Sequence, residues 1–141
     1  MDLKRTLGAV IVGVIVLYAT GWLIFDKAFA SFYAANAGPA TGVDRDPRII
    51  WAMVVGYVAY AYLIIFALRY RPGAGSAMKG LLVGATVGFL IWGTVDFVLY
   101  GVTNMANLTR TIVDPLLELV HGGISGAAIA MVLGSRMPSS T

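Results

Sequence analysis

Two acidic side chains and the chain's only histidine lie inside long apolar stretches. Asp96 is near the end of one stretch, and Glu118 and His121 lie three residues apart in the next. An unpaired charge is costly in apolar surroundings, so these groups are expected to pair or to be neutralised. Two neighbouring carboxyls cannot both ionise comfortably, and one should keep a proton unless a charged His121 compensates. Such a group of side chains could relay protons, bind a cation or hold a polar head group.

Small residues recur at every fourth position beside these ionisable groups, a spacing that lets helices in lipid pack closely. We expect the two glycine-bearing faces to meet antiparallel, with Gly88 opposite Gly126. Continued along both helices, this register pairs Gly84 with Ala130 and Gly80 with Gly134. The complete predicted packing set is Gly80, Gly84, Gly88, Gly122, Gly126, Ala130 and Gly134.

The same register predicts a polar site inside the membrane. It places Glu118 level with Asp96 and His121 level with Gly93, with Tyr18 and Tyr57 at a similar depth. Glu118 and His121 also share one helix face, because they are three residues apart. A purely structural interpretation stays open, in which these groups satisfy one another or reach interfacial water. We assign no catalytic residue and no metal ligand.

Glu118 and His121 also match the Glu-x-x-His element of di-iron four-helix bundles. Such a centre needs a second copy of the element and further carboxylates, which this chain lacks. A complete di-iron site within one chain is therefore excluded, whereas a metal shared across a symmetric dimer stays open. The chain has no cysteine, which excludes thiolate sites and disulfides.

The composition indicates a membrane protein that forms a single domain, residues 1–141. Hydrophobic residues make up 59% of the chain and charged residues 12%, far from the balance of a soluble domain. We predict an all-α integral membrane protein with four transmembrane helices, and Pro115 in the first turn of the last one. The predicted spans are about 7–25, 49–68, 80–100 and 115–133.

A cleavable signal peptide is the alternative for the first apolar stretch, because Ala28-Phe29-Ala30 resembles a cleavage site. We favour a retained helix, since the stretch is longer than a typical signal-peptide core. The following apolar segment, residues 28–35, predicts a short interfacial helix in the first outer loop. Its aromatic side chains fit membrane anchoring, and the alternative is a lid over a lipophilic ligand, formed by Phe29, Phe32 and Tyr33.

Basic residues near the ends of the spans predict that both termini are cytoplasmic. Six lie on the side of the termini and four on the opposite side. The six are Lys4, Arg5, Arg69, Arg71, Lys79 and Arg136; the four are Lys27, Arg45, Arg48 and Arg110.

Two short segments carry a family resemblance. Residues 21–27 read Gly-Trp-Leu-Ile-Phe-Asp-Lys, and residues 100–108 read Tyr-Gly-Val-Thr-Asn-Met-Ala-Asn-Leu. Together with the order of the spans, they resemble a family of small four-helix bacterial membrane proteins that shares a domain of unknown function. Asp26, Thr103, Asn104 and Asp114 match its motif positions, whereas Gly101 and Asn107 depart from them. The resemblance implies a four-helix protein of the bacterial inner membrane, without implying an activity.

Three functions are compatible with the sequence. The first is a non-enzymatic protein that binds or passes a small ligand or a proton, or an accessory subunit of a larger membrane protein. The second is a membrane-embedded enzyme acting on a lipid or isoprenoid, with Glu118 or Asp96 as general acid or base and His121 as partner. The third is a structural subunit. We rank the enzyme last because activating groups are few.

The expected surroundings follow from the same pattern. The partners are the lipid bilayer and either further copies of the chain or larger membrane proteins, with no nucleic acid. No cofactor is predicted, and a bound lipid or lipophilic ligand fits the pattern.

Overall fold

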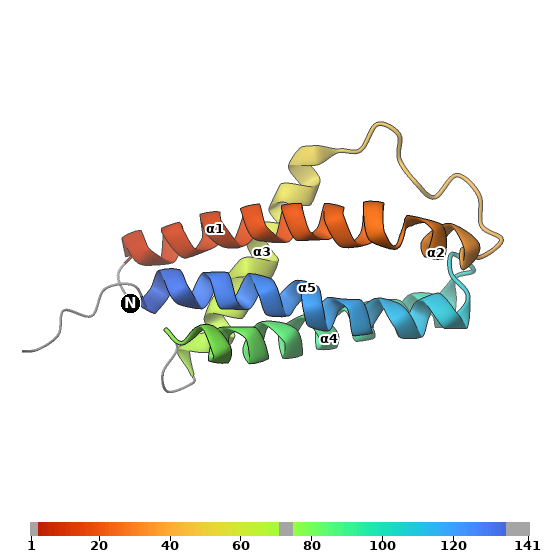
Figure 1. The fold of residues 1–141 in the computed structure, drawn as a ribbon. Helices are drawn as coiled ribbons and strands as arrows, with labels where there is room; N and C mark the ends of the chain where they lie inside the picture. The colour runs from red at the N-terminus through yellow and green to blue at the C-terminus, as the bar shows by residue number, and fades with distance from the viewer. Residues whose placement is uncertain (1–2, 71–74, 135–141) are drawn as a thin grey trace, which may run out of the picture.

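The fold consists of helices, with a long loop between α2 and α3 and a short hairpin between α4 and α5, as the computed structural model of the chain shows (Figure 1). The structure describes residues 3–70 and 75–134. Throughout these residues the regular structure is helical, apart from a single bridge between Ala37 and Ala106. The elements are α1 (Leu3–Gly21), the π-helix η1 (Trp22–Ala28), α2 (Ala30–Ala35), α3 (Ile50–Arg69), α4 (Ala77–Val102) and α5 (Leu108–Gly134).

Four helical segments are long and apolar enough to cross a bilayer: Leu3–Ala28, Ile50–Arg69, Ala77–Val102 and Leu108–Gly134. Their outward faces are apolar, as on α1, where Leu7, Ile11 and Ile15 are exposed. The predicted all-helical class and the four long apolar helices are therefore confirmed. Leu3 and Gly134 lie at the same end of the bundle and α2 at the other (Figure 1). Arg71 and Arg136, used in the charge count, lie outside the described residues.

The helix ends differ from the predicted ones mainly at the hairpin between α4 and α5. The predicted spans stop at about residue 100 and resume at about 115, whereas α4 ends at Val102 and α5 begins at Leu108. Pro115 consequently lies inside α5 and not in its first turn, so that prediction is wrong. The polar residues before Pro115 form the first turns of α5, although the proline removes one backbone hydrogen bond inside the helix.

Helices α4 and α5 make the most extensive contact of any helix pair. Their glycine-bearing faces meet, and the backbones approach so closely that a methyl group on Gly84 would overlap the carbonyl of Gly122. A methyl group on Gly80 would likewise overlap the carbonyl of Gly126. The prediction that these faces pack against each other is confirmed, and only glycine fits at these points.

The predicted register of this pair is wrong by one to two helical turns. Gly84 lies against Gly122 and Gly126 and not against Ala130, and Gly88 lies against the carbonyl of Glu118 and not against Gly126. Gly134, predicted opposite Gly80, instead lies against Gly75. Small residues recur every fourth position, so a slip of one turn exchanges one close contact for another. The helix ends at Val102 and Leu108 select the observed register, because the short hairpin leaves no chain for another.

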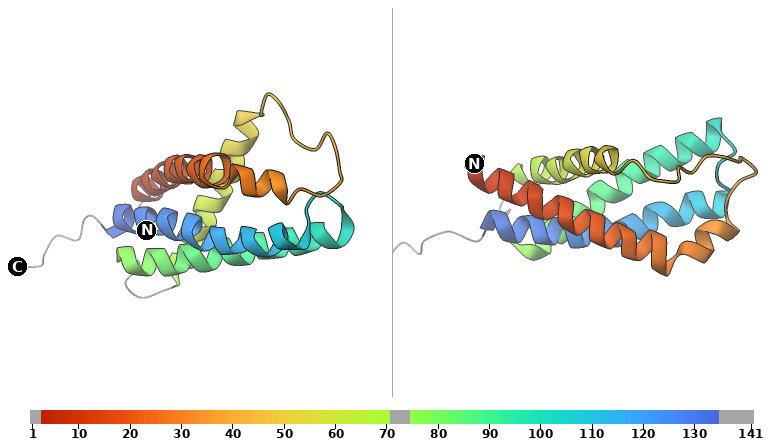
Figure 2. Two further views of the ribbon diagram at one scale, coloured as in Figure 1. Left: turned by 45° about the vertical axis from the view of Figure 1, so that its right-hand side comes forward. Right: turned by 90° about the horizontal axis from the view of Figure 1, so that it is seen from above.

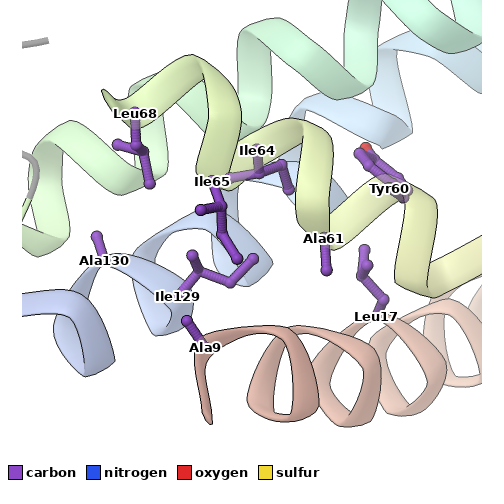
Figure 3. Packing of buried hydrophobic residues seen from close by; sticks show 9 residues of the cluster. All are labelled: Ala9, Leu17, Tyr60, Ala61, Ile64, Ile65, Leu68, Ile129 and Ala130. Carbon is purple, nitrogen blue, oxygen red and sulfur yellow. The ribbon is translucent and has the colours of Figure 1, made fainter. Parts of the chain in front are cut away.

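The half of the bundle nearest the termini has an apolar core (Figure 3). Helix α3 contributes its C-terminal half to it, and α1 and α5 pack against that half. The buried residues of this core are Ala9, Leu17, Tyr60, Ala61, Ile64, Ile65, Leu68, Ile129 and Ala130.

Helix α3 crosses the other long helices obliquely, and its N-terminal end rises away from them (Figure 1 and the left-hand view of Figure 2). Its buried residues all lie from Tyr60 onwards, whereas Trp51, Val55 and Val58 are exposed. The bundle is thus closed near the termini and open near α2.

Candidate functional site

A cavity of about 700 Å³ occupies the open half of the bundle. Every helical element except α1 contributes to its wall. Its polar and aromatic lining residues are Phe25, Asp26, Tyr33, Asp44, Arg48, Tyr57, Tyr60, Trp92, Asp96, Arg110, Asp114, Glu118 and His121. The cavity therefore gathers most of the ionisable side chains that the sequence places in or near the apolar helices.

The deepest polar group consists of Glu118 and His121 of α5 with Tyr60 of α3. Glu118 and His121 are each only 2% exposed. Nδ1 of His121 lies 3.0 Å from Oε2 of Glu118, and the Tyr60 hydroxyl donates to the same oxygen at 3.1 Å. The predicted pairing of Glu118 with His121 is thus present, and Tyr60 supplies a further donor.

The backbone of α1 fixes the tautomer of His121. Nε2 lies 2.9 Å from the carbonyl oxygen of Leu17, which can only accept, so Nε2 carries a hydrogen. Nδ1 faces the Glu118 carboxyl, and one proton is shared across this contact. The pair is either imidazolium with carboxylate or neutral imidazole with carboxylic acid, and it has no net charge in either form.

The helix type changes directly after the segment of α1 that contacts His121. Gly21 ends α1, and a methyl group there would lie 3.2 Å from the Tyr57 hydroxyl and 3.4 Å from Nε2 of His121. The π-helix η1 follows immediately, from Trp22 to Ala28. Such segments occur frequently at functional sites. Here η1 brings Phe25 edge-on to the His121 ring, with 5.5 Å between ring centroids.

A second polar group lies nearer the opening of the cavity. The Tyr33 hydroxyl of α2 donates to Oδ1 of Asp114, and the Arg110 guanidinium lies 4.8 Å from the centre of the Tyr33 ring. Burial and the neighbouring Asp114 carboxylate raise the pKa of Tyr33 above its usual range. The Tyr33 hydroxyl therefore stays protonated and remains a donor to Asp114.

Asp96 belongs to this second group and not to the Glu118 pair. The Asp96 carboxyl interacts most closely with the Asp114 carboxyl. Asp96 also lies near Arg110. The prediction that Asp96 stands level with Glu118 is wrong, because the observed register brings Gly88 to that level. Oδ2 of Asp96 is buried and has no hydrogen-bond partner within residues 3–70 and 75–134.

An ion pair joins the end of η1 to the start of α3. Arg48 donates two hydrogen bonds to Asp26, at 2.5 and 2.7 Å. The pKa of Arg48 is raised above its usual value by its hydrogen bonds to Asp26 and by the charge of that carboxylate. Arg48 is about half exposed, so the pair lies at the rim of the cavity.

The hairpin after α4 holds the segment that follows α2. The Gly38 amide donates to the Met105 carbonyl at 2.9 Å, and the Ala40 amide donates to that of Asn104 at 3.3 Å. Thr103 caps α4 through its hydroxyl, which donates to the Leu99 carbonyl. Of the four residues that carry the predicted resemblance, Thr103 and Asn104 order the hairpin, whereas Asp26 and Asp114 line the cavity.

The tyrosines of the predicted site have different positions. Tyr57 lines the cavity, and the ring of Tyr18 packs edge-on against it with 6.1 Å between centroids. Tyr18 itself lines a smaller adjoining pocket of about 170 Å³ with Trp22 and Asp26. Of the three residues proposed as a lid, Tyr33 lines the cavity, and Phe29 and Phe32 pack edge-on to each other.

Sequence reasoning missed Arg48, Arg110 and Tyr60 as members of the site. Arg48 was assigned to a loop by its charge, and only folding brings it beside Asp26. Arg110 was assigned to the hairpin, although its position four residues before Asp114 would place both on one helix face. Tyr60 carried a usable signal, because a tyrosine deep in an apolar helix needs a partner for its hydroxyl.

The ionisable groups of the cavity do not form a metal-ligand set. Within the part of the chain that the structure describes, no group of three or more His, Asp or Glu side chains is placed to hold a metal ion.

Comparison of the chain with protein-family models, with curated proteins and with solved structures finds no match. The resemblance to small four-helix bacterial membrane proteins therefore stays a prediction from the two short segments. The function must be argued from the cavity itself.

Proposed function

We propose that the chain is a non-enzymatic multi-pass protein of the bacterial inner membrane that binds a small ligand in the cavity beneath α2 and α3. The observation that carries this proposal is the cavity of about 700 Å³ that ends on the buried Glu118 and His121. Its volume lies in the range of pockets that take small molecules. The resemblance supports a location in the bacterial inner membrane. The excess of basic residues near the termini supports an orientation in which both termini are cytoplasmic.

The cavity suits binding better than passage. Beneath His121 the bundle is filled by the apolar core, in which Leu17, Ala61 and Ile129 are fully buried. A ligand entering beside α2 therefore meets a closed floor. That floor is the Glu118–His121 pair, to which the Tyr60 hydroxyl also donates.

The geometry offers less support to the two alternative functions. A purely structural subunit would present its glycine faces to a neighbouring chain, whereas Gly80, Gly84, Gly122 and Gly126 are packed inside this chain. An enzyme would need an activated group beside a reacting atom. Glu118 instead has both of its partners within the fold and carries no net charge together with His121.

Trp92 provides the test, because it lines the cavity. In a protein with Trp22→Phe and Trp51→Phe, Trp92 is the only tryptophan. Three probes of matched size are titrated: cyclohexylmethylammonium, cyclohexanecarboxylate and cyclohexylmethanol. We expect a saturable change in Trp92 fluorescence with at least one of them.

A cavity-filling variant makes this test specific. Ala34→Phe places a ring in the cavity and should abolish the response, because Ala34 lines the wall. Ala35→Phe, on the same short helix but outside that wall, is the matched control and should keep it. No saturable response to any probe, or a response unaffected by Ala34→Phe, would contradict the proposal.

A further inference from the structure

The charges that line the cavity leave an excess of acid after the internal pairs are taken into account. Five carboxyl groups line it, against two arginines and His121. Asp26 is occupied by Arg48, and Glu118 shares its proton with His121. The remaining carboxyls are Asp44, which lies near Arg48, and the neighbouring pair Asp96 and Asp114, which has Arg110 as its nearby cation.

The arginines are both engaged within the protein. Arg48 donates two hydrogen bonds to Asp26. The Arg110 guanidinium lies over the Tyr33 ring, 4.8 Å from its centre. An anionic ligand would have to break one of these contacts and approach the surplus carboxylates, whereas a cationic ligand would meet them directly.

The walls beside the carboxyls are aromatic. Tyr33, Tyr57 and Trp92 line the same cavity as Asp96 and Asp114. Aromatic faces attract cations and also cover apolar groups. Oδ2 of Asp96 is buried and has no hydrogen-bond partner within the described part of the chain, so a donor would satisfy it once the Asp96 side chain turns that oxygen toward the cavity.

We propose that the cavity selects an organic monocation, an alkylammonium group attached to a small apolar body. The ammonium group lies between Asp96 and Asp114, where it supplies the hydrogen that Oδ2 of Asp96 lacks. The apolar body lies against Tyr57 and Trp92. This inference rests on the proposed function, and it adds the charge and chemical class of the ligand.

The three matched probes decide the sign of the charge. Cyclohexylmethylammonium should bind about tenfold or more tightly than cyclohexylmethanol, because it gains a charge-assisted hydrogen bond to a carboxylate. Cyclohexanecarboxylate should be the weakest of the three. If the carboxylate or the alcohol binds as tightly as the ammonium, the inference falls while the proposed function stands; if no probe binds, both fall.

Two substitutions locate the charged group. In Asp96→Asn and in Asp114→Asn the affinity for the ammonium probe should fall about tenfold. Binding of the alcohol should be unchanged, which also shows that the variant is folded with its cavity intact. Asp46→Asn is the matched control, an exposed acid of the long loop that does not line this cavity. An unchanged preference for the ammonium probe in both cavity variants would overturn the assignment.

Discussion

The two halves of the bundle solve opposite packing problems with the same helices. Near the termini, α4 and α5 touch through bare backbone at Gly84 and Gly122, and the core beside them is apolar. Near α2, larger and polar side chains hold the helices apart around a cavity. Close backbone contact gives way to the cavity at the level of Glu118, whose carbonyl still lies against Gly88.

The helices pack closely in the half near the termini and loosely in the half near α2. In the closed half, every substitution larger than glycine at the contact points forces the helices apart. In the open half, stability depends on a few polar contacts, each of which satisfies a group that is costly to bury alone. Substitutions in the two halves should therefore fail for different reasons.

The largest effect is expected at the floor of the cavity. Glu118→Ala leaves His121 Nδ1 and the Tyr60 hydroxyl without their shared partner in a buried site. Removing one member of such a pair costs about 3–5 kcal/mol of unfolding free energy. The measurement is reversible denaturation in detergent, followed by circular dichroism.

A double variant separates loss of the pair from loss of packing. Glu118→Leu combined with His121→Leu replaces the buried polar pair by apolar groups, which is often close to neutral. We expect this double variant to be clearly more stable than Glu118→Ala. Equal destabilisation by both would mean that the pair contributes through packing alone.

An intermediate effect is expected in the closed half. Gly84→Leu drives a side chain into the Gly122 backbone and should destabilise the protein by about 1–3 kcal/mol, the usual cost of overpacking. The same denaturation assay measures it. Gly56→Leu is the matched control, because a side chain at Gly56 of α3 meets open space. Equal stability of the two variants would be incompatible with the observed contact between α4 and α5.

The smallest effect is expected at the rim. Asp26 and Arg48 are partly exposed, and such ion pairs contribute about 0.2–1 kcal/mol. A double-mutant cycle with Asp26→Asn and Arg48→Met measures this coupling energy, which should diminish as salt is added. A coupling as large as the effect of Glu118→Ala would show that the rim is as important to stability as the floor.

The sequence was sufficient to predict what is periodic. Apolar stretches gave four long helices, and the four-residue spacing from Gly80 to Gly88 and from Gly122 to Gly134 identified the helix pair with the closest contact. The pairing of Glu118 with His121 followed from their separation by three residues. These features depend on local spacing, which the chain displays directly.

Register and long-range pairing could not be predicted in the same way. Small residues at every fourth position allow close packing in registers that differ by one helical turn. Spacing alone therefore could not decide whether Asp96 meets Glu118 or Asp114. The end of α4 at Val102 and the start of α5 at Leu108 decide it. The pairing of Tyr33 with Asp114 joins residues 81 positions apart and depends on the course of α2.

The π-helix from Trp22 to Ala28 also determines the direction in which the side chains of α2 point. Each residue of an α-helix turns the chain by about 100°, so one residue more or fewer before Phe29 rotates everything downstream by that angle. Deleting a single residue there would convert wide turns to ordinary ones and would swing Tyr33 away from Asp114 without altering any residue of the pair. The shape of the cavity thus depends on the number of residues in α1 and η1 as well as on the side chains that line it.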